Sequence, residues 1–227
     1  MNNLGRVGII ISVRSNSSRL PRKALLKLMG ISTLSFLIRR LKTSIRVDEI
    51  ILATTSLSQD DELAEIGKKE KIKVYRGSLD NVVERNVLAA EKYGIETVVR
   101  ITGDCPFVSG ELVDFAIESL NQKNFDLYST NGKFRVGLEV ESYRAFRMRN
   151  LHISSVLNDR HREHLTLYYY ENFDNFHIYK IHPPAEWKTD KIFTIDNFED
   201  YNSACKIVSH FEDIHTPISS IVAASIN

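Results

Sequence analysis

The chain opens with VGIIISV (residues 7–13) and continues directly into RSNSSRLPRK (residues 14–23). The first of these segments is short, rich in β-branched residues and free of polar alternation, which is typical of a strand buried on both faces. The second places four cations within ten residues, immediately after that strand. In open parallel sheets, ligands bind at the carboxyl ends of the strands. The sequence therefore predicts a central first strand and a basic loop that faces a ligand.

Strand and helix signals alternate outward from this segment. Further strands are predicted near residues 49–54, 73–75, 97–102 and 126–128, with helices over residues 34–45, from 58, and from near 109 to 120. Another helix is expected through Val83, Val87 and Ala90, with Asp80 as a possible cap at its start and Gly94 at its end. The regular alternation of strands and helices stops over residues 131–184. There, strands are predicted at 136–142 and 176–181, and helices near Tyr143 and over 161–172. A strand at 192–195 and two last helices follow. This pattern predicts a single α/β domain with a mostly parallel sheet, helices on both faces and an inserted α+β excursion.

Composition excludes several classes of protein. The 227 residues are 43% hydrophobic and 26% charged, the balance of a globular protein. Lysine and arginine total 30 against 29 acidic residues, so the net charge of +1 predicts no nucleic-acid or membrane partner. No apolar run reaches the roughly 20 residues of a membrane span, and Cys105 and Cys205 form no disulfide framework. We therefore expect a cytoplasmic protein.

The basic loop has two interpretations. Ser15, Ser17 and Ser18 let the backbone curl around an anion, and arginine side chains bind phosphate oxygens in pairs. On charge content alone, a solvated basic turn is the commoner outcome. The position at the end of the first strand favours a polyphosphate site, although neither a Walker motif nor Gly-x-Gly-x-x-Gly is present.

Asp104 is a candidate for a metal site. In Thr102-Gly103-Asp104-Cys105-Pro106, it follows a buried strand and should emerge at the same sheet edge as the basic loop. Its carboxylate suits Mg²⁺, but it could instead bond its own turn. Further along the chain, Asp196 precedes a helix and forms a regular capping-box pattern with Glu199.

The pattern Val-Arg-x-x-Ser-x-Arg-Leu-Pro-x-Lys at residues 13–23 resembles the signature of the cytidylyltransferase superfamily. Nearly the whole chain is similar to the spore-coat polysaccharide (SpsF-like) branch, including residues 53–55, 76–82 and 100–106. The resemblance implies a Rossmann-like nucleotidyltransferase sheet of the glycosyltransferase-A kind. It implies that Arg14, Lys23 and Asp104 are catalytic, and that Asp104 and Asp196 bind Mg²⁺. Asp196 can bind the metal as well as precede the helix only if its side chain turns toward the metal and Asn197 caps the helix.

The resemblance also assigns two sets of ligand contacts and a quaternary structure. The nucleotide CTP is expected to contact Arg14, Ser15, Arg19, Lys23, Thr54, Ser78, Asp80 and Arg85. The acceptor is expected to contact Glu139, Glu141, Arg162 and His164. Related enzymes pair through the inserted region, about residues 131–184, which implies a homodimer.

Four positions depart from the family pattern. Asn16 and Arg22 stand where glycine is common, and asparagine tolerates a positive φ better than most residues. Glu139 and His161 each replace an aspartate, which points to an acceptor other than the usual one.

The implied reaction transfers CMP from CTP to a small acceptor, an acidic sugar for surface polysaccharide or glycoconjugate synthesis, and releases pyrophosphate. A glycosyltransferase using a nucleotide sugar is an alternative, but the Asp-x-Asp signature is absent. A non-catalytic nucleotide-binding protein is a second alternative. His161 and His164 could share a helix face and bind zinc, but with no third ligand nearby a solvated helix is favoured.

Overall fold

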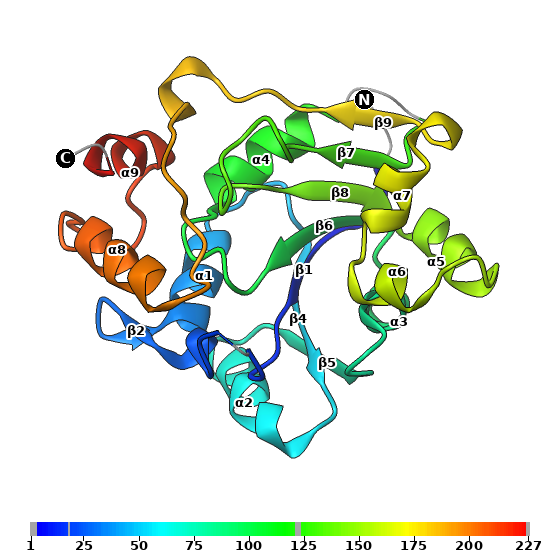
Figure 1. The fold of residues 1–227 in the computed structure, drawn as a ribbon, viewed down its shortest axis with the longest axis horizontal. Helices are drawn as coiled ribbons and strands as arrows, with labels where there is room; N and C mark the ends of the chain where they lie inside the picture. Colours follow the sequence, from blue (N-terminus) through cyan, green and yellow to red (C-terminus); the bar gives the residue numbers. More distant parts are fainter. Residues whose placement is uncertain (1–3, 18, 121–123, 226–227) are drawn as a thin grey trace.

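The computed structural model describes residues 4–17, 19–120 and 124–225 (Figure 1). The strands are β1 Val7–Ser12, β2 Lys27–Leu28, β3 Ile31–Ser32, β4 Glu49–Thr55, β5 Lys73–Gly77, β6 Thr97–Thr102, β7 Leu127–Ser129, β8 Glu141–Arg144 and β9 Ile178–Lys180. The helices are α1 Thr33–Leu41, α2 Asp61–Lys69, α3 Val82–Tyr93, α4 Gly110–Glu118, α5 Ala145–Ile153, α6 Asp159–Glu163, α7 Leu167–Glu171, α8 Phe198–Val208 and α9 Ile218–Ala224. Short 3₁₀ turns lie at Lys23–Leu25, Ser58–Asp60, Phe173–Asn175 and Ala185–Trp187.

One seven-stranded sheet, in the order β5-β4-β1-β6-β8-β7-β9, organises the molecule. The first four strands of this order run parallel, β8 is antiparallel to β6 and β7, and β9 is parallel to β7. The first strand of the sequence therefore lies inside the sheet, between β4 and β6. The prediction of a mostly parallel α/β sheet is confirmed.

Helices cover both faces of the sheet, as the apolar strands predict. Ile9 and Ile11 of β1 belong to the core beneath α1, α4, α8 and α9. Ile10, between them, belongs to the opposite core beneath α3, α5 and α7. Figure 1 shows the two helix layers on either side of the sheet. Because alternate residues of a strand point to opposite faces, both faces of β1 are fully buried.

The prediction is less accurate in the excursion. The strand expected at residues 136–142 is β8, which begins only at Glu141, and the helix expected near Tyr143 is α5. The single helix expected over residues 161–172 is two short helices, α6 and α7. His164 ends α6 with φ −105° and ψ 87°, which turns the chain and breaks the predicted helix.

The strand predicted at residues 192–195 is wrong. Phe193 donates to Val136 O and Ile195 donates to Asp104 O, but these single bonds join two different loops and form no ladder. Phe193 and Ile195 are each 1% exposed, which explains their strand-like apolar pattern. Gly137 permits this packing, because a Cβ at its φ of +94° would lie 2.3 Å from the Phe193 carbonyl carbon. Within the described part of the chain, no helix is long and apolar enough to cross a membrane.

Candidate active site

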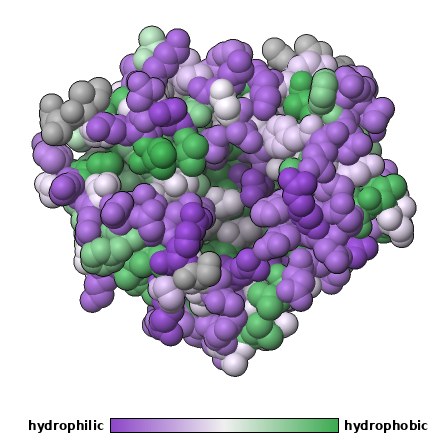
Figure 2. Space-filling view, in the orientation of Figure 1, coloured by the Kyte–Doolittle hydropathy of each residue, from purple (hydrophilic) through white to green (hydrophobic). Residues whose placement is uncertain are grey.

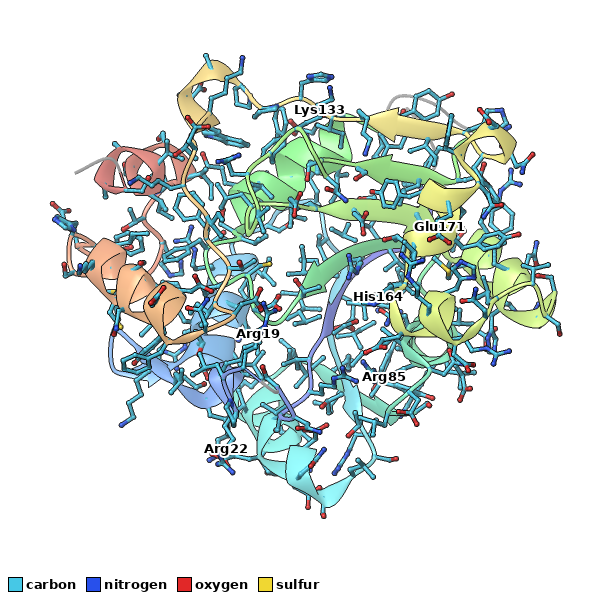
Figure 3. The ribbon with its side chains drawn as sticks, in the orientation of Figure 1. Arg19, Arg22, Arg85, Lys133, His164 and Glu171 are labelled. Carbon is cyan, nitrogen blue, oxygen red and sulfur yellow. The ribbon has the colours of Figure 1, made fainter. Side chains whose placement is uncertain are left out.

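A cavity of about 400 Å³ opens at the carboxyl ends of β1 and β6. Figure 2 shows it as a hollow near the centre of the molecule, bordered mainly by hydrophilic residues. In Figure 3, Arg19 lies on one side of this hollow, and Arg85 and His164 lie on the other. The structure brings the following predicted residues to its wall: Arg14, Arg19, Lys23, Arg85, Asp104, His164 and Asp196.

The close approach of β1 and β6 places the basic loop beside Asp104. The Gly103 amide donates to Ser12 O at 3.0 Å. A Cβ on Gly103 would lie 2.6 Å from Val13 Cβ, so no larger residue fits between the two strand ends without a shift. The glycine before Asp104 therefore allows the ends of β1 and β6 to lie close together, which places the Asp104 carboxylate beside the start of the basic loop.

The buried carboxylate of Asp60 fastens this loop. It accepts from the Ser15 amide at 2.7 Å and from the Thr55 hydroxyl. Burial would raise the pKa of Asp60, but the donors from Thr55 and Ser15 outweigh it and hold the pKa below its ordinary value. Ser15 thus serves the shape of the loop and is absent from the cavity wall. The expected contribution of Ser18 lies outside the described residues.

Asn16 and Arg22, the two loop positions where the family commonly has glycine, differ in backbone conformation. Arg22 adopts φ +58°, a left-handed conformation that glycine reaches without strain, whereas Asn16 does not have a positive φ. The Arg22 amide donates to Ser15 O at 3.1 Å and so closes the loop. Its side chain pairs with Glu62 at 2.5 Å and points away from the cavity. The turn therefore forms with arginine in place of glycine.

Lys23 joins the two aspartates. Its ammonium lies 3.0 Å from Asp104 Oδ2 and 2.8 Å from Asp196 Oδ1. Burial would lower the pKa of Lys23, but the two carboxylates outweigh it and raise the pKa. Burial would raise the pKa of Asp104, but Lys23 and Thr102 outweigh it and lower the pKa. Lys23 and Asp104 are therefore both charged at neutral pH.

Asp196 is free to face the cavity because its neighbours cap α8. The Asn197 side chain accepts from the Asp200 amide, and the Asp200 carboxylate accepts from the amides of Asp196 and Asn197. Glu199 takes no part in this capping box. Ile195 donates to Asp104 O at 2.9 Å, which holds the two aspartate segments together.

The two carboxylates fit a magnesium ion. Both converge on one cation, the Lys23 ammonium, and Mg²⁺ commonly takes one or two carboxylates together with phosphate oxygens and water. Within the described residues, no group of three or more histidine, cysteine or acidic side chains could hold a metal by itself. A metal at this position would thus need oxygens from a ligand. The zinc hypothesis fails, because His161 Nε2 is 2.7 Å from Glu171 and its Nδ1 accepts from the Asn158 amide.

Besides Ser15, three residues predicted to contact the nucleotide do not line the cavity. Thr54 is fully buried, and its hydroxyl has no hydrogen-bond partner among the described residues. The Ser78 hydroxyl accepts from the Asn81 amide, while Asp80 is exposed. Asn81, not Asp80, caps α3.

The predicted acceptor residues are also divided. His164 lines the cavity, but Arg162 pairs with Asp159 at 3.2 Å on the exposed side of α6. Glu139 is half-buried and accepts weakly from Gly132 N at 3.4 Å. Glu141 is 4% exposed and lies behind the cavity wall, where it accepts from Arg100 and from the hydroxyls of Thr166 and Tyr170.

Two charged residues of the cavity wall were not among the predicted site residues. Arg100 lies in β6 and bonds Glu141 at 2.7 Å. Glu163 ends α6 and pairs with Arg14 at 3.0 Å. An arginine within an otherwise apolar strand was a usable signal for Arg100, because such residues are rarely buried unless paired. The sequence carried no comparable signal for the contact between Glu163 and Arg14.

A Glu141→Gln variant should lose about 3 kcal/mol of unfolding free energy, because it leaves the Arg100 guanidinium partly buried without its carboxylate. Urea denaturation followed by circular dichroism measures this loss. The matched control is Glu139→Gln, which should lose less than about 1 kcal/mol. Equal losses in the two variants would show that the Arg100–Glu141 pair is not a structural support of the cavity wall.

A basic loop and two convergent carboxylates at the carboxyl edge of a mostly parallel sheet are the features of a nucleotidyltransferase. Residues 8–216 match the cytidylyltransferase family, and this chain belongs to that family. It is 36% identical over 214 residues to uncharacterized protein MJ1063 of Methanocaldococcus jannaschii, covering 94% of this chain and 87% of the relative. It is 30% identical over 200 residues to the spore coat polysaccharide biosynthesis protein SpsF of Bacillus subtilis, covering 86% and 82% of the two chains.

The fold is similar to that of a solved cytidylyltransferase from Leptospira borgpetersenii. The two structures agree with a TM-score of 0.90 at 29% identity, over 96% of this chain and 92% of that one. The expected family, fold class and enzymatic nature of the chain are therefore confirmed.

Proposed function

We propose that this protein transfers CMP from CTP to a hydroxyl group of a small acceptor, with release of pyrophosphate. The observation that carries the proposal is the convergence of Arg14, Arg19 and Lys23 with Asp104 and Asp196 on one cavity. A cation-rich wall binds a polyphosphate, and two carboxylates at the same edge fit the magnesium ion that accompanies it. The family match favours this activity over a glycosyltransferase or a non-catalytic binding protein.

In the proposed reaction, the acceptor hydroxyl oxygen bonds to the α-phosphorus of CTP and its proton passes to water. At the same time, the bond between the α-phosphorus and the oxygen that bridges to the β-phosphate breaks. Arg14, Arg19 and Lys23 bind the β- and γ-phosphates and stabilise the charge that develops on pyrophosphate. For this, Arg14 leaves Glu163, Arg19 leaves Asp196, and Lys23 leaves both aspartates. Each of these cations then binds phosphate oxygens instead. Asp104 and Asp196 would hold Mg²⁺, which supplies Lewis-acid stabilisation of the α-phosphate. The contribution of the protein is mainly positioning and charge neutralisation.

We propose an acidic sugar as the acceptor and the synthesis of a surface polysaccharide or glycoconjugate as its use. The similarity to the Bacillus subtilis spore coat protein supports this role. Arg100 and His164 lie on the cavity wall, where side chains that donate hydrogen bonds suit an acidic acceptor. A place in the cytoplasm fits the use of CTP.

We propose a homodimer that forms through the inserted region. Phe146, Ile153 and Val156, on or just after α5, are 52%, 59% and 48% exposed. Figure 2 shows an apolar patch at the edge of the molecule formed by α5. Burial of such side chains against a second copy would remove apolar surface from water.

The proposed activity predicts that pyrophosphate appears only when CTP, Mg²⁺ and a suitable acceptor are all present. A coupled pyrophosphate assay with a panel of acidic sugars and phosphorylated small acceptors tests this. ATP, GTP and UTP serve as nucleotide controls, and they should give at most a small fraction of the rate with CTP. The absence of pyrophosphate with every acceptor, together with no binding of CTP, would refute the proposal.

A further inference from the structure

Arg85 differs from every other cation on the cavity wall. Arg14 pairs with Glu163, Arg19 and Lys23 pair with Asp196, and Arg100 pairs with Glu141, all at 2.7–3.3 Å. No carboxylate among the described residues forms an ion pair with Arg85. Within the described part of the chain, Arg85 Nη1 donates to the main-chain oxygen of Ser78 at 2.6 Å, and its Nε is buried without a partner.

The buried charge of Arg85 is unfavourable for the stability of the ligand-free fold. The residue is only 2% exposed, and a buried charge without an ionic partner destabilises a fold unless a ligand neutralises it. Burial, and after it the charge of Arg14, lowers the pKa of Arg85 to about 10, so the side chain is still cationic at neutral pH. Asp60 acts on Arg85 only from a distance, because its carboxylate is taken up by Ser15 and Thr55.

We infer that Arg85 is a preformed anion anchor, which together with Arg14 binds a phosphate group of the nucleotide. This inference deepens the proposed function and rests on it. Arg14 must first release Glu163, whereas Arg85 has no carboxylate to release. Two guanidinium groups on one wall can bind the same phosphate through several charge-assisted hydrogen bonds. A neutral cytosine ring would leave the charge of Arg85 uncompensated, which favours a phosphate as its partner over the base.

Arg40 provides a matched control within the same chain. It is 1% exposed, burial likewise lowers its pKa to about 10, and its Nε also has no partner. Unlike Arg85, it donates to three main-chain oxygens, those of Ile214, Thr216 and Phe107. It does not line the cavity. Arg40 is thus a buried arginine whose hydrogen bonds serve the fold.

The test compares wild type, Arg85→Met, Arg85→Lys and Arg40→Met by thermal unfolding and by calorimetric titration with pyrophosphate, CTP and cytidine. Arg85→Met should keep or raise the unfolding temperature of the ligand-free protein, because it removes an uncompensated charge. It should bind pyrophosphate and CTP about tenfold to a hundredfold more weakly, which is the value of a charge-assisted hydrogen bond. Arg85→Lys should recover part of this affinity. Arg40→Met should unfold at a lower temperature and bind both ligands as the wild type does.

The possible outcomes separate this inference from the proposed function. Wild-type pyrophosphate affinity in Arg85→Met overturns the inference, and if cytidine binding were lost instead, Arg85 would be assigned to the base. A loss of stability in Arg85→Met as large as in Arg40→Met, with unchanged ligand affinity, would make Arg85 structural. A wild-type protein that binds pyrophosphate through Arg85 but shows no preference for CTP would refute the proposed function alone. A wild-type protein that binds neither pyrophosphate nor CTP would overturn both the inference on Arg85 and the proposed function.

Discussion

An Asp104→Asn variant should turn over CTP about a thousandfold more slowly than the wild type, a change of roughly 4 kcal/mol in the activation barrier. The substitution keeps the size of the side chain but removes the charge that Lys23 neutralises at 3.0 Å. An amide is a poor ligand for a hard cation, so the proposed Mg²⁺ would lose one of its two protein carboxylates. Pyrophosphate release at saturating CTP and Mg²⁺ measures the effect.

The control for this substitution is Asp126→Asn. Asp126 is also buried, at 4% exposure, and it accepts from the His177 amide and pairs with Arg147. It precedes β7 and therefore lies at the opposite end of that strand from the active edge. This variant should lose stability but keep its turnover number when folded. Wild-type turnover in Asp104→Asn would remove Asp104 from the catalytic site.

A Lys23→Met variant should lower kcat/KM for CTP by about a hundredfold to a thousandfold, the range seen when one charge-stabilising donor is removed from an active site. The same variant should bind Mg²⁺ more tightly in the absence of nucleotide, because the ammonium that bridges Asp104 and Asp196 is gone. It should also unfold at a lower temperature without Mg²⁺, since two neighbouring carboxylates lose their shared cation. Calorimetric titration with Mg²⁺ and steady-state kinetics measure these opposite changes.

Lys27→Met is the comparison for that experiment. Lys27 is an exposed residue of β2, four positions further along the chain, and it does not line the cavity. Its replacement should change neither the kinetics nor the affinity for Mg²⁺. If Lys23→Met weakened the binding of Mg²⁺ instead, the ammonium would not be competing with the metal for the two carboxylates.

The features predicted correctly from the sequence are those with local causes. The apolar strands around Ile10 and the loop after Val13 follow from periodicity and from charges at a strand end. Asp104 was a candidate for this edge because it follows an apolar strand. Asp196 was a candidate only through the family resemblance, and the segment before it is held by single hydrogen bonds and is no strand.

The features that escaped prediction depend on which distant side chains meet. Glu141 resembled a ligand contact, but Arg100, Thr166 and Tyr170 enclose it behind the wall. Ser15 resembled a phosphate contact, but it is held by Asp60, which lies 45 residues away in sequence. Motif similarity indicates which residues accompany a site. It does not separate those that line the cavity from those that support its wall.

Calorimetric titration of the protein with CTP, with and without Mg²⁺, is the most direct test of the central claim, because it requires no knowledge of the acceptor. We predict that CTP binds in the presence of Mg²⁺, at least about tenfold more tightly than ATP, GTP or UTP, a difference of roughly 1.4 kcal/mol. We also predict that Asp104→Asn loses the Mg²⁺-dependent part of this affinity. Equal affinity for all four nucleotides, or no binding of CTP with Mg²⁺ present, would contradict the assignment of the cavity as a CTP site.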